Sequence, residues 1–249
     1  MQLQGTVAVV TGGNGGLGRR ICHALAKEGC DIALVYMQSH ESAHAFAGEL
    51  QATGVRAEAI ACDVADGPQV ERMIETVRDR FGRLDILVND AAYNKWIPFN
   101  DLAALTLAEW DKILSVNLTG PMLCSKAAAQ TMQHAGAGRI VNIASIAGLA
   151  PSGSSIPYAV SKAGLIHLTR CMAVGLAPDI LVNCVAPGHL EGTRATANLA
   201  AEYRERATQS SLLKRAADRE DVAQQVVGLC KTDSITGQTI VVDAGRVFH

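Results

Sequence analysis

The sequence predicts an α/β protein whose single domain, residues 1–249, is built on a doubly wound parallel sheet. Short β-rich runs alternate with longer helical patterns from one end of the chain to the other. The predicted strands are continuous apolar runs, which is typical of a parallel sheet covered by helices on both faces. No linker, low-complexity segment or internal repeat divides the chain.

Seven strands are expected, with crossover helices between them. In chain order the expected strands are TVAVVT, DIALVYM, RAEAIACDV, LDILVND, GRIVNIAS, ILVNCVAPG and GQTIVVDAG. The expected helices are GRRICHALAKEG, a helix that contains HESAH, VERMIETVRDRFG, a long helix through residue 132, a helix from about Pro157 to Ala177, and a polar helical region at about 195–229.

The composition favours a globular protein that acts on small molecules. Hydrophobic residues make up 49% of the chain, and the mean hydropathy of +0.16 predicts a well-filled core. A net charge of −2 gives no electrostatic footprint for nucleic acid or for an anionic membrane. No leader pattern and no run of about 18 uncharged apolar residues is present, so we expect a cytoplasmic, soluble protein. The seven cysteines are scattered without a C-x-x-C pattern and are expected to be reduced.

The segment TGGNGGLG, from Thr11 to Gly18, lies between the first predicted strand and the first predicted helix. Glycines allow the backbone to approach a pyrophosphate closely, and free N–H groups at the start of a helix favour negative charge. In this position the turn predicts a dinucleotide site, with a tight turn that holds no ligand as the alternative.

The spacing T-G-x-x-x-G-x-G resembles that of the short-chain dehydrogenase/reductase family, and further motifs follow in that family's order. They are Asp63 in CDV, Asn89 in NDAA, Asn117 in SVNLTG, Ser145 in NIASIAG, Tyr158 and Lys162 in YAVSK, and VNCVAPG ending at Gly188. Asp90 and Ala92 depart from the family's N-N-A-G pattern. The resemblance covers essentially the whole chain and extends to members such as 3-oxoacyl-[acyl-carrier-protein] reductases and glucose 1-dehydrogenases. It implies a Rossmann domain and an NAD(P)-dependent oxidoreductase that interconverts a ketone and a secondary alcohol.

The resemblance also implies a cofactor bound along the strand ends, with Asp63 on the adenine amino group and Lys162 on the nicotinamide ribose. The expected cofactor-binding residues are Gly12, Asn14, Gly16, Leu17, Gly18, Tyr36, Ser39, His40, Asp63, Val64, Asn89, Ala91, Tyr158, Lys162, Pro187 and Gly188.

Tyr158 and Lys162 are four residues apart, so on a helix their side chains share one face. A neighbouring ammonium stabilises phenolate, so we expect Lys162 to lower the pKa of Tyr158 and to make it a general acid or base. Taken alone, such a pair is more often a surface pair. Ser145 follows a predicted strand, where it would hydrogen-bond the substrate oxygen, and a turn serine is the alternative. The resemblance adds Asn117 to this catalytic set.

Pro121 lies four residues after Asn117 in the same predicted helix and has no N–H to donate to the Asn117 carbonyl. We therefore expect that carbonyl to be free to bind a water. In the family resembled, this carbonyl anchors a water that connects the lysine to solvent. Pro121 would thus help to build a proton relay.

Tyr36 ends the second predicted strand, where an acidic residue commonly binds the ribose 2′-OH of NAD. Neither an acidic residue nor an arginine stands there, and Gly15 occupies a position that is basic in many NADP enzymes of the family. The sequence favours NADP, with Ser39 and His40 as candidate donors to its 2′-phosphate, and NAD is the alternative.

The stretch HESAH, His40 to His44, matches the zinc-protease pattern H-E-x-x-H. A catalytic zinc needs a third protein ligand, and the residues that follow offer only Glu49. We expect no metal site here, and a zinc peptidase is kept as the alternative.

Loops that follow predicted strands supply the expected substrate pocket, which consists of Tyr93, Trp96, Ser145, Leu149, Ser154, His189 and Leu190. The segment 189–215 is expected to close over the site as a lid, with a solvated helical insert as the alternative. The substrate would be a ketone or secondary alcohol of modest size: a sugar, a 3-oxoacyl group or a hydroxylated ring. An acyl-carrier-protein partner would need a basic patch, for which Arg139 and Arg170 are too few.

The expected helices around 107–132 and 157–177 are small and apolar nearly all round, so one sheet cannot cover them. We expect a second subunit, and the resemblance implies a homotetramer with VVDAGRVFH at an interface. A catalytically silent nucleotide-sensing regulator on the same fold is an alternative that would more often have lost the tyrosine or the lysine.

Overall fold

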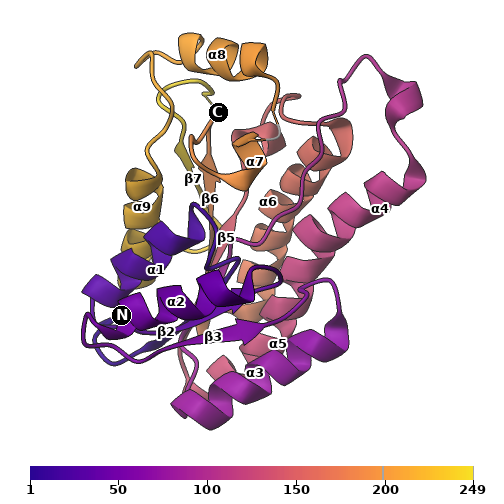
Figure 1. The fold of residues 1–249 in the computed structure, drawn as a ribbon. Helices are drawn as coiled ribbons and strands as arrows, with labels where there is room; N and C mark the ends of the chain where they lie inside the picture. Colours follow the sequence, from indigo (N-terminus) through magenta and orange to yellow (C-terminus); the bar gives the residue numbers. More distant parts are fainter. Residues whose placement is uncertain (198, 249) are drawn as a thin grey trace.

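The strands form one parallel sheet at the centre of the molecule (Figure 1), in a computed structural model that describes residues 1–197 and 199–248. Within these residues the sheet has seven strands in the order β3-β2-β1-β4-β5-β6-β7. The strands are β1 (Val7–Thr11), β2 (Asp31–Tyr36), β3 (Ala57–Ala61), β4 (Ile86–Asn89), β5 (Gly138–Ile143), β6 (Ile180–Pro187) and β7 (Thr239–Val242). All neighbouring pairs are parallel, which confirms the predicted doubly wound fold.

Helices cover both faces of this sheet, as the continuous apolar strands require (Figure 1). One face carries α1 (Gly18–Lys27), α2 (His40–Gln51) and α9 (Arg219–Lys231), and the other carries α3 (Gly67–Phe81), α5 (Gly120–Ala135) and α6 (Ile156–Leu176). The helix α4 (Leu107–Leu114) packs beside α6. Further helices lie in the segments between these elements: η1 (Leu102–Ala104), η3 (Ile146–Gly148), α7 (Arg194–Ala197) and α8 (Ala201–Gln209).

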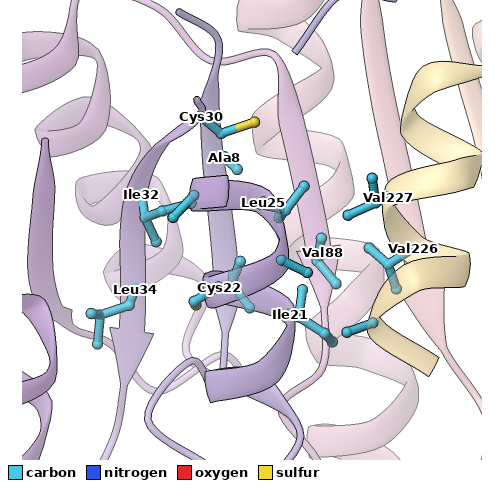
Figure 2. Close-up of a cluster of buried hydrophobic side chains, with 14 of the residues drawn as sticks. Ala8, Ile21, Cys22, Leu25, Cys30, Ile32, Leu34, Val88, Val226 and Val227 are labelled. Atoms are coloured by element: carbon cyan, nitrogen blue, oxygen red, sulfur yellow. The ribbon is translucent and has the colours of Figure 1, made fainter. Parts of the chain in front are cut away.

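The apolar core is split by the sheet into layers, one of which is shown in Figure 2. There Ile21 and Leu25 of α1 and Val226 of α9 lie against Ala8 and Val88 of the central strands. All five side chains are completely buried. At roughly 1.5–3 kcal/mol for each large apolar side chain removed from water, such layers hold the strand ends in fixed positions.

The strand order reverses between β1 and β4, which are direct neighbours although β2 and β3 intervene in the chain. Crossovers from β1 lead toward β3, whereas those from β4 lead toward β7. In open α/β sheets the crevice at such a switch point, outside the carboxyl ends of the strands, is where ligands bind. Thr11 and Asn89 stand opposite each other at this edge.

The long helix expected through residue 132 is interrupted. A π-helical turn, η2 (Ser115–Thr119), separates α4 from α5. There the Gly120 N–H donates to the Ser115 carbonyl five residues back, and Pro121 follows without any N–H. The polar region at 195–229 is likewise divided, into α7, α8 and α9. No helix among the described residues is long and apolar enough to span a bilayer.

Candidate active site

The glycine turn between β1 and α1 is shaped by close backbone contacts. Gly12 has φ of +67°, and a Cβ there would lie 3.0 Å from the Ala91 Cα. A Cβ on Gly18 would lie 2.3 Å from the Gly12 carbonyl oxygen, so no larger residue fits. The helix α1 begins at Gly18, its N-cap Leu17 forms no side-chain capping bond, and its first turn has no acidic residue. This uncompensated helix start fits a pyrophosphate group.

Asp90 stands beside this turn at the end of β4. Its N–H donates to the Thr11 Oγ1 over 3.1 Å. Burial raises the pKa of Asp90 to about 7, and the nearby Lys162 ammonium and Gly18 N–H act in the opposite direction. The carboxyl group is therefore partly protonated near neutral pH, so it adds less negative charge beside the phosphate turn than an ordinary aspartate would.

The end of β2 gathers the residues expected around the adenosine ribose. The rings of His40 and His44 lie 4.2 Å apart, and both pack edge-on against Tyr36. Ser39 adopts a left-handed conformation with φ of +64°. Its Oγ accepts a hydrogen bond of 3.1 Å from the guanidinium of Arg194, a residue of α7. A basic side chain therefore does reach this place, from a helix 155 residues further along the chain.

The same geometry bears on the zinc alternative for HESAH. His40 and His44 are exposed on the first turns of α2. Among the described residues, no group of three or more histidine, cysteine, aspartate or glutamate side chains is placed to hold a metal ion.

The remaining predicted cofactor residues lie along the same edge, with one exception. Asn14 donates to the Gln38 carbonyl, and the Asp63 carboxylate accepts the Ala65 N–H. The exception is Asn89, whose side-chain amide is engaged inside the protein. Its amide donates to the Asn142 Oδ1 at 2.8 Å within the buried interior. The other expected residues on strand ends and in loops are Gly16, Val64, Pro187 and Gly188.

Ser145 and Tyr158 line one cavity of about 70 Å³ at the carboxyl end of β5. Ser145 precedes η3, and its Oγ accepts the Ala147 N–H. Tyr158 is in the first turn of α6, which starts at the buried cap Ser155; the Ser155 Oγ accepts the Tyr158 N–H. The cap and Pro157 fix where α6 begins, and with it the position of the phenol.

Lys162 lies one helical turn beyond Tyr158 and is only 3% exposed. Its Nζ donates to the Ile143 carbonyl over 2.8 Å and lies 5.8 Å from the centre of the Tyr158 ring. Burial lowers the pKa of Lys162 to about 8, while Asp90 acts in the opposite direction. The predicted pairing of these two side chains on one helix face is present.

The predicted lowering of the Tyr158 pKa is wrong for this structure. Burial raises the pKa of Tyr158 to about 12, and the hydrogen bond with Ser145 offsets only part of the rise. The reason is that the phenol itself is buried, which penalises the phenolate, while the Lys162 Nζ is directed to the Ile143 carbonyl. Tyr158 is therefore a protonated phenol at neutral pH.

Asn117 lies in the π-helical turn, completely buried. Its side chain holds the loop after β4 through two hydrogen bonds with the Tyr93 backbone, of 2.8 and 2.9 Å. It also donates to the Ser161 Oγ on α6 over 3.2 Å. Because the side-chain amide of Asn117 is used in these hydrogen bonds, a proton relay at this residue would have to use its backbone carbonyl.

The predicted substrate residues are only partly brought together. Ser145, Ser154 and His189 line the cavity, and Trp96 packs against Tyr203, which also lines it. The remaining three do not line it. The Tyr93 hydroxyl donates to Glu109, Leu149 packs against a small apolar cluster, and Leu190 is buried in the core where its backbone pairs with Ala217.

The expected lid at 189–215 contains α7 and α8, and it lies beyond the carboxyl ends of β6 and β7 (Figure 1). A Cβ on Gly16 would lie 2.3 Å from the Gly192 carbonyl oxygen, so this segment rests directly on the phosphate turn. A second cavity of about 540 Å³ lies between α7 and α8 and shares His189 and Thr196 with the smaller one.

Sequence reasoning missed Tyr203 and Arg246, which also line the smaller cavity, because neither belongs to a motif.

Comparisons with known proteins agree with this arrangement. The family model for short chain dehydrogenases matches residues 6–204. The chain is 40% identical over 242 residues to the protein named "Granaticin polyketide synthase putative ketoacyl reductase 2" of Streptomyces violaceoruber, covering 96% of this chain and 95% of that one. It is 37% identical to a 3-oxoacyl-[acyl-carrier-protein] reductase of Synechocystis sp., covering 99% and 98%. A short chain dehydrogenase from Burkholderia cenocepacia J2315, solved in complex with NADP, superposes with a TM-score of 0.91 at 35% identity over 99% of both chains.

Proposed function

This chain belongs to the short-chain dehydrogenase family, and from that premise we propose that it reduces a small ketone to a secondary alcohol with NADPH, with Tyr158 as the general acid. It is an NAD(P)-dependent oxidoreductase that acts on CH–OH or keto groups. The observation that carries the finer proposal is the shared cavity of Ser145 and Tyr158, with the Lys162 ammonium beside the phenol ring.

The protonation states favour the direction of reduction. A phenol with a pKa of about 12 holds its proton at neutral pH, and ketone reduction requires a proton on the carbonyl oxygen. Ser145 would donate a hydrogen bond to the same oxygen, which fixes the carbonyl and stabilises the charge that develops on it. The bound nicotinamide would supply the hydride.

After transfer, Tyr158 must regain its proton. Lys162, with a pKa of about 8, is the buried cation next to the phenol. We propose that the Asn117 backbone carbonyl and a bound water connect this lysine to solvent. The π-helical turn and the missing N–H of Pro121 support this role, because both remove ordinary helical donors from that stretch of backbone.

The basic residue near Ser39 favours NADPH. Arg194 is an exposed guanidinium that already contacts the Ser39 hydroxyl. Ser39, His40 and Arg194 would together bind a 2′-phosphate, since a guanidinium forms strong charge-assisted hydrogen bonds with phosphate. Because Arg194 belongs to α7, such a contact would also hold the lid closed over the cofactor.

The relatives named as ketoacyl reductases make a 3-oxoacyl thioester the second candidate substrate. We further propose that the enzyme works in the cytoplasm as a homotetramer. Its seven cysteines are all unpaired, which is the usual state in a reducing compartment.

One experiment tests the chemistry. NADPH and NADH are titrated by fluorescence into wild type and Tyr158→Phe, and each protein is then assayed against a ketone panel. We expect Tyr158→Phe to bind NADPH and to lose about 100-fold or more of kcat, because the proton donor is gone while the cofactor site is intact. A Tyr158→Phe variant that reduces ketones as fast as wild type would remove Tyr158 from the mechanism.

The same titration tests the cofactor choice. We expect Arg194→Met to lower the NADPH-to-NADH affinity ratio by about tenfold, since one charge-assisted contact to the 2′-phosphate is lost. His40→Ala is measured beside it. Variants that keep the wild-type ratio would show that these side chains do not select the cofactor.

A further inference from the structure

The cavity that holds Ser145 and Tyr158 contains one permanently charged side chain among the described residues that line it. That side chain is Arg246, which follows β7 near the carboxyl end of the chain. His189 lines the same cavity, and burial lowers its pKa, so it is neutral at pH 7. No aspartate or glutamate is among these described lining residues. Arg246 is therefore the charged group that this cavity offers to a ligand, although the carboxylates of Glu191 and Asp90 act on His189 and Tyr158 from outside the lining.

Arg246 is held in place by its neighbours. The Asp243 carboxylate is buried and accepts the N–H groups of Gly245, at 2.9 Å, and Val247, at 2.6 Å. The Gly245 carbonyl in turn accepts the N–H of Leu212 from the lid segment. The backbone on both sides of Arg246 is thus fixed, which sets the point from which its side chain extends.

Two further polar groups of the cavity lack a protein partner. Ser154 is 2% exposed, and its Oγ forms no hydrogen bond with any described residue. The Nδ1 of His189 is also buried without a partner among the described residues. A buried polar atom without a hydrogen bond costs about 1–3 kcal/mol, so such atoms in a cavity indicate a polar ligand.

We propose that the substrate carries a carboxylate, that Arg246 binds it, and that Ser154 and His189 provide hydrogen bonds beside it. The inference rests on the proposed function, because it assigns Ser145 and Tyr158 to the ketone end of the same molecule. The substrate class is then a small keto acid, reduced to the corresponding hydroxy acid. A planar guanidinium matches a carboxylate through two parallel hydrogen bonds.

This assignment differs from the second candidate substrate in a measurable way. A 3-oxoacyl thioester is uncharged around its ketone, so it would leave Arg246 unpaired in the cavity. A free keto acid would pair it. The two classes can be compared directly with matched acids, methyl esters and N-acetylcysteamine thioesters.

The test measures kcat/KM for acetoacetate, levulinate and 2-oxobutyrate, each against its methyl ester, and for the acetoacetyl N-acetylcysteamine thioester. We expect wild type to prefer at least one acid over its ester by about tenfold or more. In Arg246→Met that acid-to-ester ratio should fall by about tenfold, mainly through KM. Arg246→Lys should restore part of it. The matched control Arg206→Met removes a positive charge from α8 at a residue that lines neither cavity, and should keep the ratio.

A wild type that prefers the esters or the thioester throughout would overturn the proposal, as would an Arg246→Met variant with an unchanged ratio. Reduction of neutral ketones without any acid preference would overturn the carboxylate site and leave the oxidoreductase proposal intact. If wild type reduces none of the ketones in the panel, the proposed function itself is overturned.

Equilibrium binding gives a second measurement that needs no turnover. Calorimetry with Tyr158→Phe in the presence of NADPH compares acetoacetate and levulinate with their methyl esters. We expect binding of an acid that is lost when Arg246→Met is added to the same protein. Equal binding to both proteins would overturn the role of Arg246.

Discussion

At Asp90 the chain places a carboxyl group where the family it resembles usually has asparagine. The side chain is half-buried beside the phosphate turn and Lys162, and its pKa of about 7 lies well above that of a free aspartate. Folding raises the pKa of this carboxyl, so the ionised carboxylate is less favourable in the folded chain than in the unfolded chain. At a pH where the carboxyl is ionised in both, this difference lowers the free energy of unfolding. Asp90 therefore lowers stability at alkaline pH.

We predict that Asp90→Asn stabilises the protein, and that the gain depends on pH. The penalty from Asp90 begins near pH 4, where the unfolded carboxyl starts to ionise while the folded one is protonated, and it is nearly complete above pH 7, the folded pKa. The gain in unfolding free energy should be roughly 1–3 kcal/mol at pH 8 and should fall toward zero at pH 4. Urea unfolding at both pH values measures it. A gain of equal size at both pH values would show that packing, and not the charge, causes it.

The sequence predicted which residues lie in the site where those residues belong to a recognisable motif. Ser145 and Tyr158 follow from motifs and do share a cavity. Arg194 and Arg246 do not follow from any motif, because each reaches its site from a distant segment and its own sequence neighbourhood carries no signal. The Tyr158 pKa was mispredicted because sequence spacing reports that a cation is near and does not report how far burial penalises charge.

At the scale of elements, the start of α6 decides where the phenol lies. Ser155 is fully buried at the cap, and its Oγ accepts the N–H of Tyr158 over 3.4 Å. The expected start near Pro157 is close to the observed start at Ile156. Such a boundary is predictable because proline favours the first helical turn and serine favours the cap. The π-helical turn between α4 and α5 was not predicted as such, since Pro121 signals a missing donor and leaves open how the helix adjusts.

We predict that Ser155→Ala costs about 1 kcal/mol of stability, as the loss of a helix cap usually does, and also lowers kcat. The second effect follows because Tyr158 is in the first turn, which loosens when its cap is lost. Asp66→Ala is the matched control, since Asp66 caps α3 by accepting the Gln69 N–H and does not line the cavity. It should cost similar stability and leave kcat unchanged. Equal kcat in the two variants, after correction for the folded fraction, would contradict the positioning role of Ser155.

At the scale of the whole molecule, the outward face of α6 is not covered by any other part of the described chain. Exposed side chains recur along it at helical spacing: Val160, Ala163, His167, Arg170, Cys171 and Val174. Val160 is 43% exposed and Val174 is 85% exposed. The stripe is mainly small or apolar and has no acidic residue, so water is a poor cover for it. Sequence reasoning identified this helix as lacking a polar face, and the structure shows which of its sides is left uncovered.

We predict that this stripe packs against the same stripe of a second subunit, because symmetric homo-oligomers reuse one surface on both partners. Val174→Asp would place a charge, and its symmetry copy, within the contact. In a tetramer with two kinds of interface, loss of this one leaves dimers, so light scattering coupled to size exclusion should show the mass fall by half. Met37→Asp, which charges an exposed apolar residue on another part of the surface, should keep the wild-type mass.

A wild-type protein that is already monomeric would contradict the prediction. A Val174→Asp protein that keeps the wild-type mass would place the subunit contact on another surface, such as the exposed Leu212 and Leu213 beside the carboxyl end of the chain.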